Sequence, residues 1–185
     1  MARILTFSGS SRKDSLNDKL VRFLGSLASE AGATVTHISL ADYPLAIYNG
    51  DDEAELGQPE NAARLRDLIS DHDGLIIGCP EYNGFMTPLL INTIDWCTRA
   101  AGASPDLSAF MDRKVLIAAS SPGPGGAGRA AAHLRTMLNG IGSIVVPMPV
   151  LVPNGFSAFE DDGSLTNDKM ARMQTGKLLH LCEKL

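Results

Sequence analysis

Short apolar runs alternate with segments of helical periodicity along the whole chain. Five short runs predict strands at 3–8, 33–40, 74–79, 114–121 and 143–150, of which 33–40 is the more polar. After each run, apolar side chains recur every three or four residues, as they do from Leu16 to Leu27. Five helices are predicted. The first starts near residue 16, the second includes 62–69, the third starts at Thr87-Pro88, and the last two occupy about 128–139 and 167–184. This alternation predicts an α/β fold, a parallel sheet with helices on both faces.

The polarity of the runs indicates how the strands are ordered. The run at 74–79 is apolar throughout, as in a strand buried on both faces. The run at 143–150 contains prolines, which cannot donate to a strand ladder, and therefore fits a sheet edge. Of the two common doubly wound orders, these features favour the flavodoxin-like order 2-1-3-4-5, a three-layer sandwich formed by one domain over 1–185. Its ligands bind between strands 1 and 3, at the loops 9–16 and 80–87.

Composition narrows the possible partners. The chain has 185 residues, 44% of them apolar, and a net charge of −5, which argues against nucleic acid or an anionic membrane as a partner. No apolar stretch approaches the roughly 18 residues of a membrane span, and no leader pattern is recognised at the start. Cys79, Cys97 and Cys182 lack zinc-type spacing and fit reduced thiols. We therefore expect a cytoplasmic protein.

The loop after the first strand, S-G-S-S-R-K-D-S-L-N-D-K at 8–19, has the chemistry of an anion site. Hydroxyl, amide and guanidinium donors lie beside a helix start, whose unpaired N–H groups favour phosphate. The hydroxyls are those of Ser10, Ser11 and Ser15, the amide is that of Asn17, and the guanidinium is that of Arg12. A local alternative remains open, because Ser15-Leu16-Asn17-Asp18 is also a helix-capping pattern that would use the Ser15 hydroxyl.

Two further loops have unusual composition. The segment C-P-E-Y-N-G-F-M-T-P at 79–88 offers Tyr82 and Phe85 beside free backbone amides, which suits a flat, partly polar ring; the alternative is a surface turn. The segment S-S-P-G-P-G-G-A-G at 120–128 formally matches the dinucleotide motif G-x-G-x-x-G. It follows the fourth strand instead of the first, and no acidic residue lies about 20 positions later. A backbone-lined loop closing over a ring explains its glycines better.

Other catalytic patterns are absent from the sequence. It contains no G-x-x-x-x-G-K-[ST], H-E-x-x-H or G-x-S-x-G motif, and its four histidines are scattered. Trp96 is expected in packing. A cofactor must therefore carry any redox chemistry.

Three stretches together resemble the signatures of the NADPH-dependent FMN reductase family. They are G-S-S-R-K-D-S-L-N at 9–17, P-E-Y-N-G at 80–84 with L-I-N-T-I-D-W at 90–96, and S-P-G-P-G-G at 121–126. The resemblance implies that FMN is the cofactor, NADPH or NADH the reductant, and a homodimer or homotetramer the assembly. It implies that Ser10, Arg12, Ser15 and Asn17 hold the phosphate and that Leu16 between them is also a cofactor-binding residue. It implies that the ring is held by Pro80, Glu81, Tyr82, Asn83, Gly84, Ser120, Ser121 and Gly123. Ile91 stands where relatives commonly have lysine, which puts in doubt any subunit contact made by that lysine; Trp96 and the polar segment 41–58 are implied candidates for an interface or a lid.

Three functions are compatible with this sequence. The first is an enzyme that passes hydride from NAD(P)H through bound FMN to a small acceptor such as a quinone, an azo compound, a metal oxyanion or free flavin. In that enzyme no side chain is an obligatory acid or base. The second is a flavodoxin-type electron carrier with a protein partner, against which the modest charge and Arg12 argue. The third is a flavin-free binding domain on the same fold.

Overall fold

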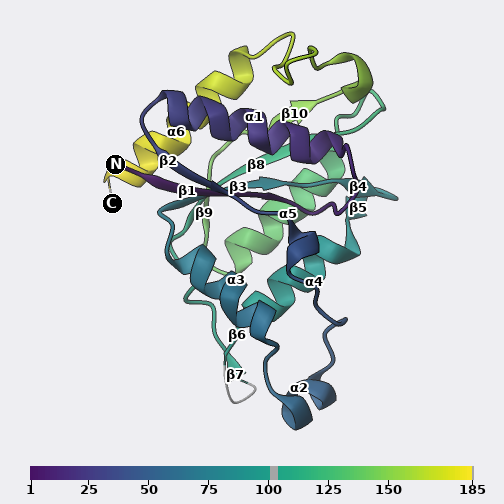
Figure 1. Ribbon diagram of the computed structural model, residues 1–185, viewed down its shortest axis with the longest axis vertical. Coiled ribbons are helices and arrows are strands. Elements are labelled where there is room, and N and C mark those ends of the chain that lie inside the picture. The colour runs from purple at the N-terminus through teal and green to yellow at the C-terminus, as the bar shows by residue number, and fades with distance from the viewer. Residues whose placement is uncertain (101–103, 185) are drawn as a thin grey trace.

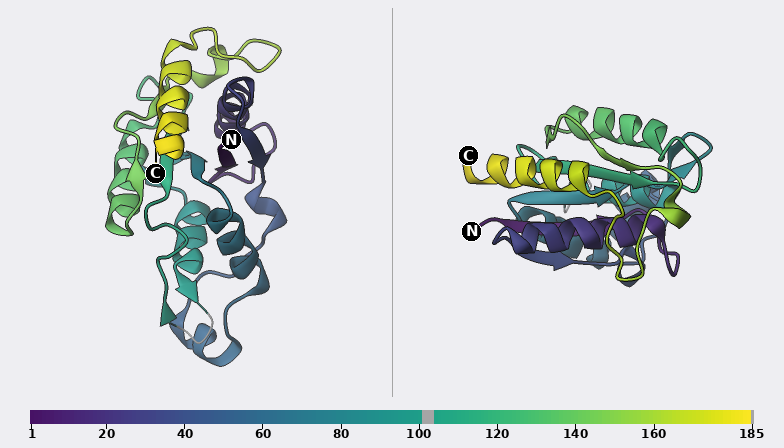
Figure 2. Two further views of the ribbon diagram at one scale, coloured as in Figure 1. Left: turned by 90° about the vertical axis from the view of Figure 1, so that its left-hand side faces the viewer. Right: turned by 90° about the horizontal axis from the view of Figure 1, so that it is seen from above.

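A sheet of parallel strands lies between two layers of helices (Figure 1; Figure 2). The computed structural model describes residues 1–100 and 104–184. The strand order is β10-β8-β3-β1-β2, and β9 also pairs with β8, which confirms the flavodoxin-like order. The strands of this sheet are β1 (Arg3–Ser8), β2 (Thr34–His37), β3 (Gly74–Gly78), β8 (Lys114–Ser120), β9 (Ile144–Val145) and β10 (Val150–Val152).

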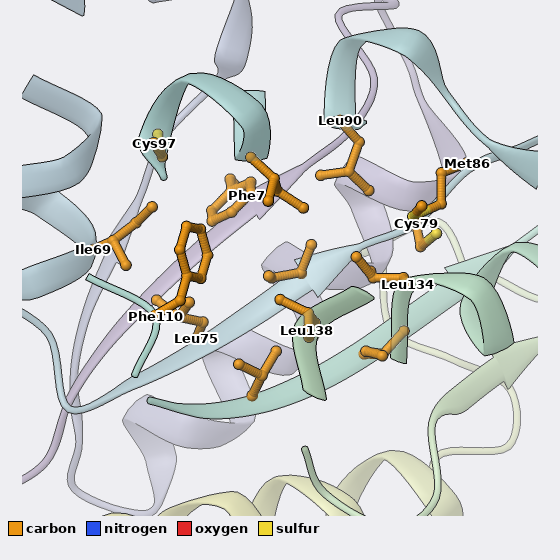
Figure 3. Close-up of a cluster of buried hydrophobic side chains, with 14 of the residues drawn as sticks. Phe7, Ile69, Leu75, Cys79, Met86, Leu90, Cys97, Phe110, Leu134 and Leu138 are labelled. Carbon is orange, nitrogen blue, oxygen red and sulfur yellow. The ribbon is translucent and has the colours of Figure 1, made fainter. Parts of the chain in front are cut away.

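Side chains alternate between the two faces of each strand and so build two cores. On one face, Leu5 and Phe7 pack with residues of three helices; on the other, Ile4 packs with residues of two. Figure 3 shows the first core, where Phe7 and Leu75 of the sheet lie among Leu90, Leu134 and neighbouring side chains. The first face is covered by α3 (Glu60–Ser70), α4 (Pro88–Cys97) and α5 (Gly128–Gly140), the second by α1 (Leu16–Glu30) and α6 (Lys169–Lys184).

The predicted fifth strand is wrong in detail, because it is split in two. From Val145 to Val150 the edge advances five residues, whereas its partner β8 advances three, from Val115 to Ala118. Pro147 and Pro149 lie in this excursion, and a proline has no N–H to donate to β8. The strand therefore lies at the edge, as expected, but pairs only at its two ends.

The second strand is shorter than predicted. It ends at His37, and Ser39 then caps a short 3₁₀ helix, η1 (Leu40–Asp42), by accepting a hydrogen bond from the Ala41 N–H. The polar segment that follows contains α2 (Gly50–Leu56), which lies at one end of the molecule (Figure 1). The strands β6 (Arg99–Ala100) and β7 (Ser104–Pro105) pair antiparallel near it.

Hydrogen bonds hold the segment before α2 against α4. Asn92 accepts from the Tyr48 N–H at 2.8 Å and donates to the Ala46 carbonyl at 2.9 Å. The buried Trp96 indole also donates to that carbonyl, at 2.8 Å, and so contributes to packing, as the sequence predicts. Among the described residues, no helix is both long and apolar enough to cross a membrane.

Candidate functional site

A pocket opens at the carboxyl ends of β1, β3 and β8. The three loops that the sequence singles out as candidates for ligand binding, which follow these strands, meet there. Ten of the thirteen residues expected to bind the cofactor line it. They are Ser10, Arg12, Ser15, Leu16, Asn17, Pro80, Glu81, Tyr82, Ser120 and Ser121. The structure therefore brings together segments more than 100 residues apart in the chain, at the edge of the sheet where ligands of this topology bind.

Close packing draws the first two loops together. The Gly9 N–H donates to the Gly78 carbonyl at 2.9 Å, and the Thr87 hydroxyl donates to the Gly9 carbonyl at 2.7 Å. A Cβ on Gly9 would lie 2.7 Å from the Cβ of Leu90, closer than such atoms come. Gly9 thus lets the loop after β1 rest directly on the start of α4.

The start of α1 forms one wall of the pocket. Ser15 is its N-cap, and the hydroxyl oxygen accepts from the Asp18 N–H at 3.4 Å. The capping role left open by the sequence is therefore present, while the hydroxyl proton remains a donor for a ligand. Leu16 and Asn17 belong to the first turn, where backbone N–H groups have no partner within the helix. Hydroxyl, amide and helix dipole are thus available on one wall.

Asn17 clamps α1 to the end of β8. Its side-chain N–H donates to the Ser120 carbonyl at 2.9 Å, and its side-chain oxygen accepts from the Ser120 N–H at 3.0 Å. The residue is only 5% exposed. Its oxygen and one of its two amide hydrogens are therefore engaged within the protein, and a single N–H is left for a ligand.

Arg12 and Asp14 bring opposite charges to the pocket rim. Both side chains are exposed and both residues line the pocket. Within residues 1–100 and 104–184, no salt bridge involves Arg12. Asp14 has a positive φ of 58°. The guanidinium is available to an anion, but the neighbouring carboxylate offsets part of its charge.

The segment after β3, expected as a loop that binds a ring or as a surface turn, forms a tight hairpin. β4 (Glu81–Tyr82) pairs with β5 (Phe85–Met86), and Asn83 and Gly84 both have positive φ, at 54° and 84°. Asn-Gly is the pair that such two-residue turns favour. Pro80, Glu81 and Tyr82 line the pocket, whereas Asn83 and Gly84 form the turn outside its lining.

The Glu81 carboxylate is already engaged by α5. Partial burial raises its pKa, but hydrogen bonds from the Arg129 side chain and the Ala130 N–H outweigh this and hold the pKa below its usual range. Glu81 is therefore ionised near neutral pH and paired, so it is poorly suited to move a proton. Burial raises the pKa of the Cys79 thiol to about 12, which leaves it unreactive.

The loop after β8 and the loop after β10 (Val150–Val152) lie against each other. The Gly155 N–H donates to the Ser121 carbonyl at 2.9 Å and the Asn154 N–H to the Gly123 carbonyl at 3.1 Å. Gly123 itself lines an adjoining depression that shares Glu81 and Ser121 with the pocket.

Phe156 lines the pocket and was missed by sequence reasoning. It lies in the 3₁₀ turn η2 (Gly155–Ser157), and its side chain is 79% exposed. Its position just after the last strand of the sheet was the signal that could have found it. Pro122 and Asp14 also line the pocket without having been expected there. Ile91 is partly buried against the first core.

Comparisons with known proteins agree on one family. Residues 2–157 match the model of the NADPH-dependent FMN reductase family. The chain is 35% identical to a quinone reductase of Escherichia coli over 147 residues, which are 80% of this chain and 74% of that protein. It is 32% identical over 168 residues to an NAD(P)H-dependent FMN reductase of Pseudomonas aeruginosa, covering 90% and 86% of the two chains. Among solved structures, the flavoenzyme NAD(P)H:(acceptor) oxidoreductase FerB from Paracoccus denitrificans superposes with a TM-score of 0.79 at 30% identity, covering 99% of this chain and 96% of that one.

Proposed function

Since the chain belongs to the NADPH-dependent FMN reductase family, we propose that it is an FMN-dependent NAD(P)H oxidoreductase whose acceptor is a quinone. The observation that carries the proposal is the meeting of three loops in one pocket, with anion donors on the α1 wall and an aromatic hairpin on another. The resemblance seen in the sequence thus has a spatial counterpart.

The donor set of the pocket fits a flavin phosphate. The hydroxyls of Ser10 and Ser15, the Arg12 guanidinium and the first-turn N–H groups of α1 all line the same pocket. This combination binds phosphate at helix starts. In our proposal Arg12 supplies charge, while Leu16 and Asn17 supply N–H donors. Of the two carboxylates that line the pocket, those of Asp14 and Glu81, that of Glu81 is paired with Arg129.

The ring of FMN would lie against the hairpin and the loop after β8. We propose that Pro80, Glu81 and Tyr82 contact it with Ser120 and Ser121, and that Asn83, Gly84 and Gly123 shape these loops from outside the pocket lining. When bound, FMN supplies hydride acceptance from the nicotinamide and delivery of two electrons to the acceptor.

The protein's own part is to bind, orient and exclude water. None of the pocket-lining side chains is a histidine or a cysteine, and Glu81 is held ionised in its pair. We therefore assign no side chain the role of general acid or base. Tyr82 and Phe156, 53% and 79% exposed, offer apolar surface to a flat ring at the mouth. We favour a quinone as the acceptor, because its flat ring suits such surfaces and because two relatives are named quinone reductase.

Three coarser features complete the proposal. We propose one domain over residues 1–185, because both cores share one sheet. We propose a homo-oligomer, dimer or tetramer, on the family resemblance, and a cytoplasmic location, because Cys79, Cys97 and Cys182 are all free thiols. Size-exclusion chromatography with light scattering tests the proposed homo-oligomer, because a monomer at all concentrations would contradict it.

The experiment for the function combines a titration with an acceptor panel. Apoprotein titrated with FMN should quench the fluorescence of the flavin with one-to-one stoichiometry. The loaded protein should then oxidise NADPH or NADH several-fold faster with 1,4-benzoquinone than with an azo dye, chromate or free flavin. Protein that gains no flavin absorbance refutes the cofactor assignment, and equal or higher rates with the other acceptors refute the quinone.

A further inference from the structure

The hairpin β4–β5 is fastened to α5 by several separate contacts. The Arg129 guanidinium donates to one Glu81 oxygen from Nη2 at 2.6 Å and from Nε at 3.0 Å. The same guanidinium lies 3.5 Å from the position that a Cβ on Gly84 would take. On the second strand of the hairpin, the Phe85 ring lies 4.5 Å, centroid to centroid, from the His133 ring. The hairpin thus rests on two successive turns of α5.

Glu81 also replaces the missing cap of that helix. Ala127 is the N-cap residue of α5, has left-handed backbone geometry, and offers no side-chain cap. The second Glu81 oxygen accepts from the Ala130 N–H at 3.2 Å, a first-turn donor that a capping side chain would otherwise satisfy. A carboxylate at this end of a helix is also favoured by the helix dipole. The Glu81 side chain therefore both caps α5 and holds the hairpin against it.

The location of this pair gives it a role in the pocket. Glu81 lines the pocket between Pro80 and Tyr82, its side chain is 13% exposed, and that of Arg129 is 77% exposed. The hairpin has only two residue pairs of its own, too few for independent stability. Its position, and with it one wall of the pocket, must therefore depend on contacts to α5.

We propose that Glu81 is a positioning residue, whose side chain, through Arg129 and the first turn of α5, holds the hairpin wall in the geometry that receives the flavin ring. This inference rests on the proposed function and assigns the side chain a role separate from backbone contact with the cofactor. It also predicts that the carboxylate charge beside the ring is neutralised as long as the pair is intact.

Two variants and one control test the pair. Glu81→Gln keeps the size of the side chain and removes its charge; Arg129→Gln breaks the same pair from the exposed side, where loss of folding is not expected. Asp168→Asn is the matched control, because it breaks the Asp168–Arg172 pair at the start of α6, away from the pocket. Amide hydrogen exchange of the apoproteins, FMN dissociation constants and the midpoint potential of bound FMN are measured for all four proteins.

The expected result is local. Exchange should accelerate about tenfold at 81–86 in both pair variants and remain at the wild-type rate in β1 and β3. The FMN dissociation constant should rise about three- to tenfold. The midpoint potential should rise in Glu81→Gln, which leaves a positive charge, and fall in Arg129→Gln, which leaves a negative one. The control should match the wild type in all three.

Other results would overturn the inference. Wild-type exchange at 81–86 with wild-type FMN affinity would show that the hairpin holds its place without the pair. Faster exchange across the whole sheet with an unchanged potential would assign the pair to fold stability instead. If the wild-type protein itself binds no FMN, the proposed function fails, whereas a wild type that binds FMN alongside unaffected variants refutes only the role of Glu81.

Discussion

The Asn17 clamp provides a prediction that separates structural from ligand-binding roles in the pocket. Replacing Asn17 with Ala removes two hydrogen bonds to the Ser120 backbone, at 2.9 and 3.0 Å. Both residues are buried, at 5% and 3% exposure. The substitution therefore leaves a carbonyl and an N–H of the β8 end without partners, in addition to removing a donor near the ligand.

The magnitude follows from these two bonds. Each buried partner left unsatisfied costs about 1–3 kcal/mol, and the two bonds lie at one site, so a combined loss of about 2–4 kcal/mol is expected. For a domain of this size, each kcal/mol lowers the melting temperature by about 2–4 °C, so that of the FMN-free protein should fall by about 4–16 °C.

The assay is thermal and urea unfolding of the apoprotein, without FMN. Asn92→Ala is the matched control, because Asn92 makes the same pair of bonds to the backbone of Ala46 and Tyr48 from a half-exposed position. Its loss should cost about 1 kcal/mol and leave FMN affinity unchanged. An Asn17→Ala apoprotein as stable as the wild type, with FMN binding lost, would refute the clamp and make Asn17 a ligand contact alone.

Three further predictions concern charge and the pocket mouth. Arg12→Ala should weaken FMN by about 1.5–3 kcal/mol, roughly 10- to 150-fold, with unchanged apoprotein stability, whereas Asp14→Asn should tighten it; fluorescence titration measures both. The hydrogen bond from Arg99 holds the pKa of buried Glu53 below its usual range. This pair therefore stabilises the folded protein fully at pH values above the pKa that Glu53 has in the unfolded chain. The stabilisation is lost as the pH falls through the lower pKa of the folded state. Glu53→Gln should be less stable at neutral pH and lose less stability on acidification, which urea unfolding against pH would reveal; a parallel decline with the wild type contradicts it. Phe156→Ala should raise the FMN dissociation constant several-fold and increase iodide quenching of bound flavin, and unchanged quenching would remove Phe156 from the mouth.

The sequence predicted the sheet because its strongest signals are local. Apolar runs and helix starts such as Thr87-Pro88 depend on neighbouring residues, and Thr87 is indeed the N-cap of α4, accepting from the Leu90 N–H. The split of the last strand was not predicted. The hydrophobic pattern does not show that the segment containing Pro147 and Pro149 has two more residues than the stretch of β8 that it passes.

Contacts between distant segments were the part that the sequence could not supply. Motif resemblance pointed to Asn17, but its partner Ser120 lies 103 residues away. Likewise Glu81 could be placed in the pocket wall, yet its bond to Arg129 depends on how α5 packs against the hairpin. Such pairs arise from tertiary packing, which leaves no periodic trace in the chain.

The most direct test of the central claim is anaerobic stopped-flow mixing of the FMN-loaded protein with NADPH, followed by 1,4-benzoquinone. We predict that the flavin absorbance bleaches on the first mixing, with no other protein present, and returns on the second as the quinone is reduced. Flavin that stays oxidised with both NADPH and NADH until a partner protein is added would contradict the account and identify the chain as an electron carrier.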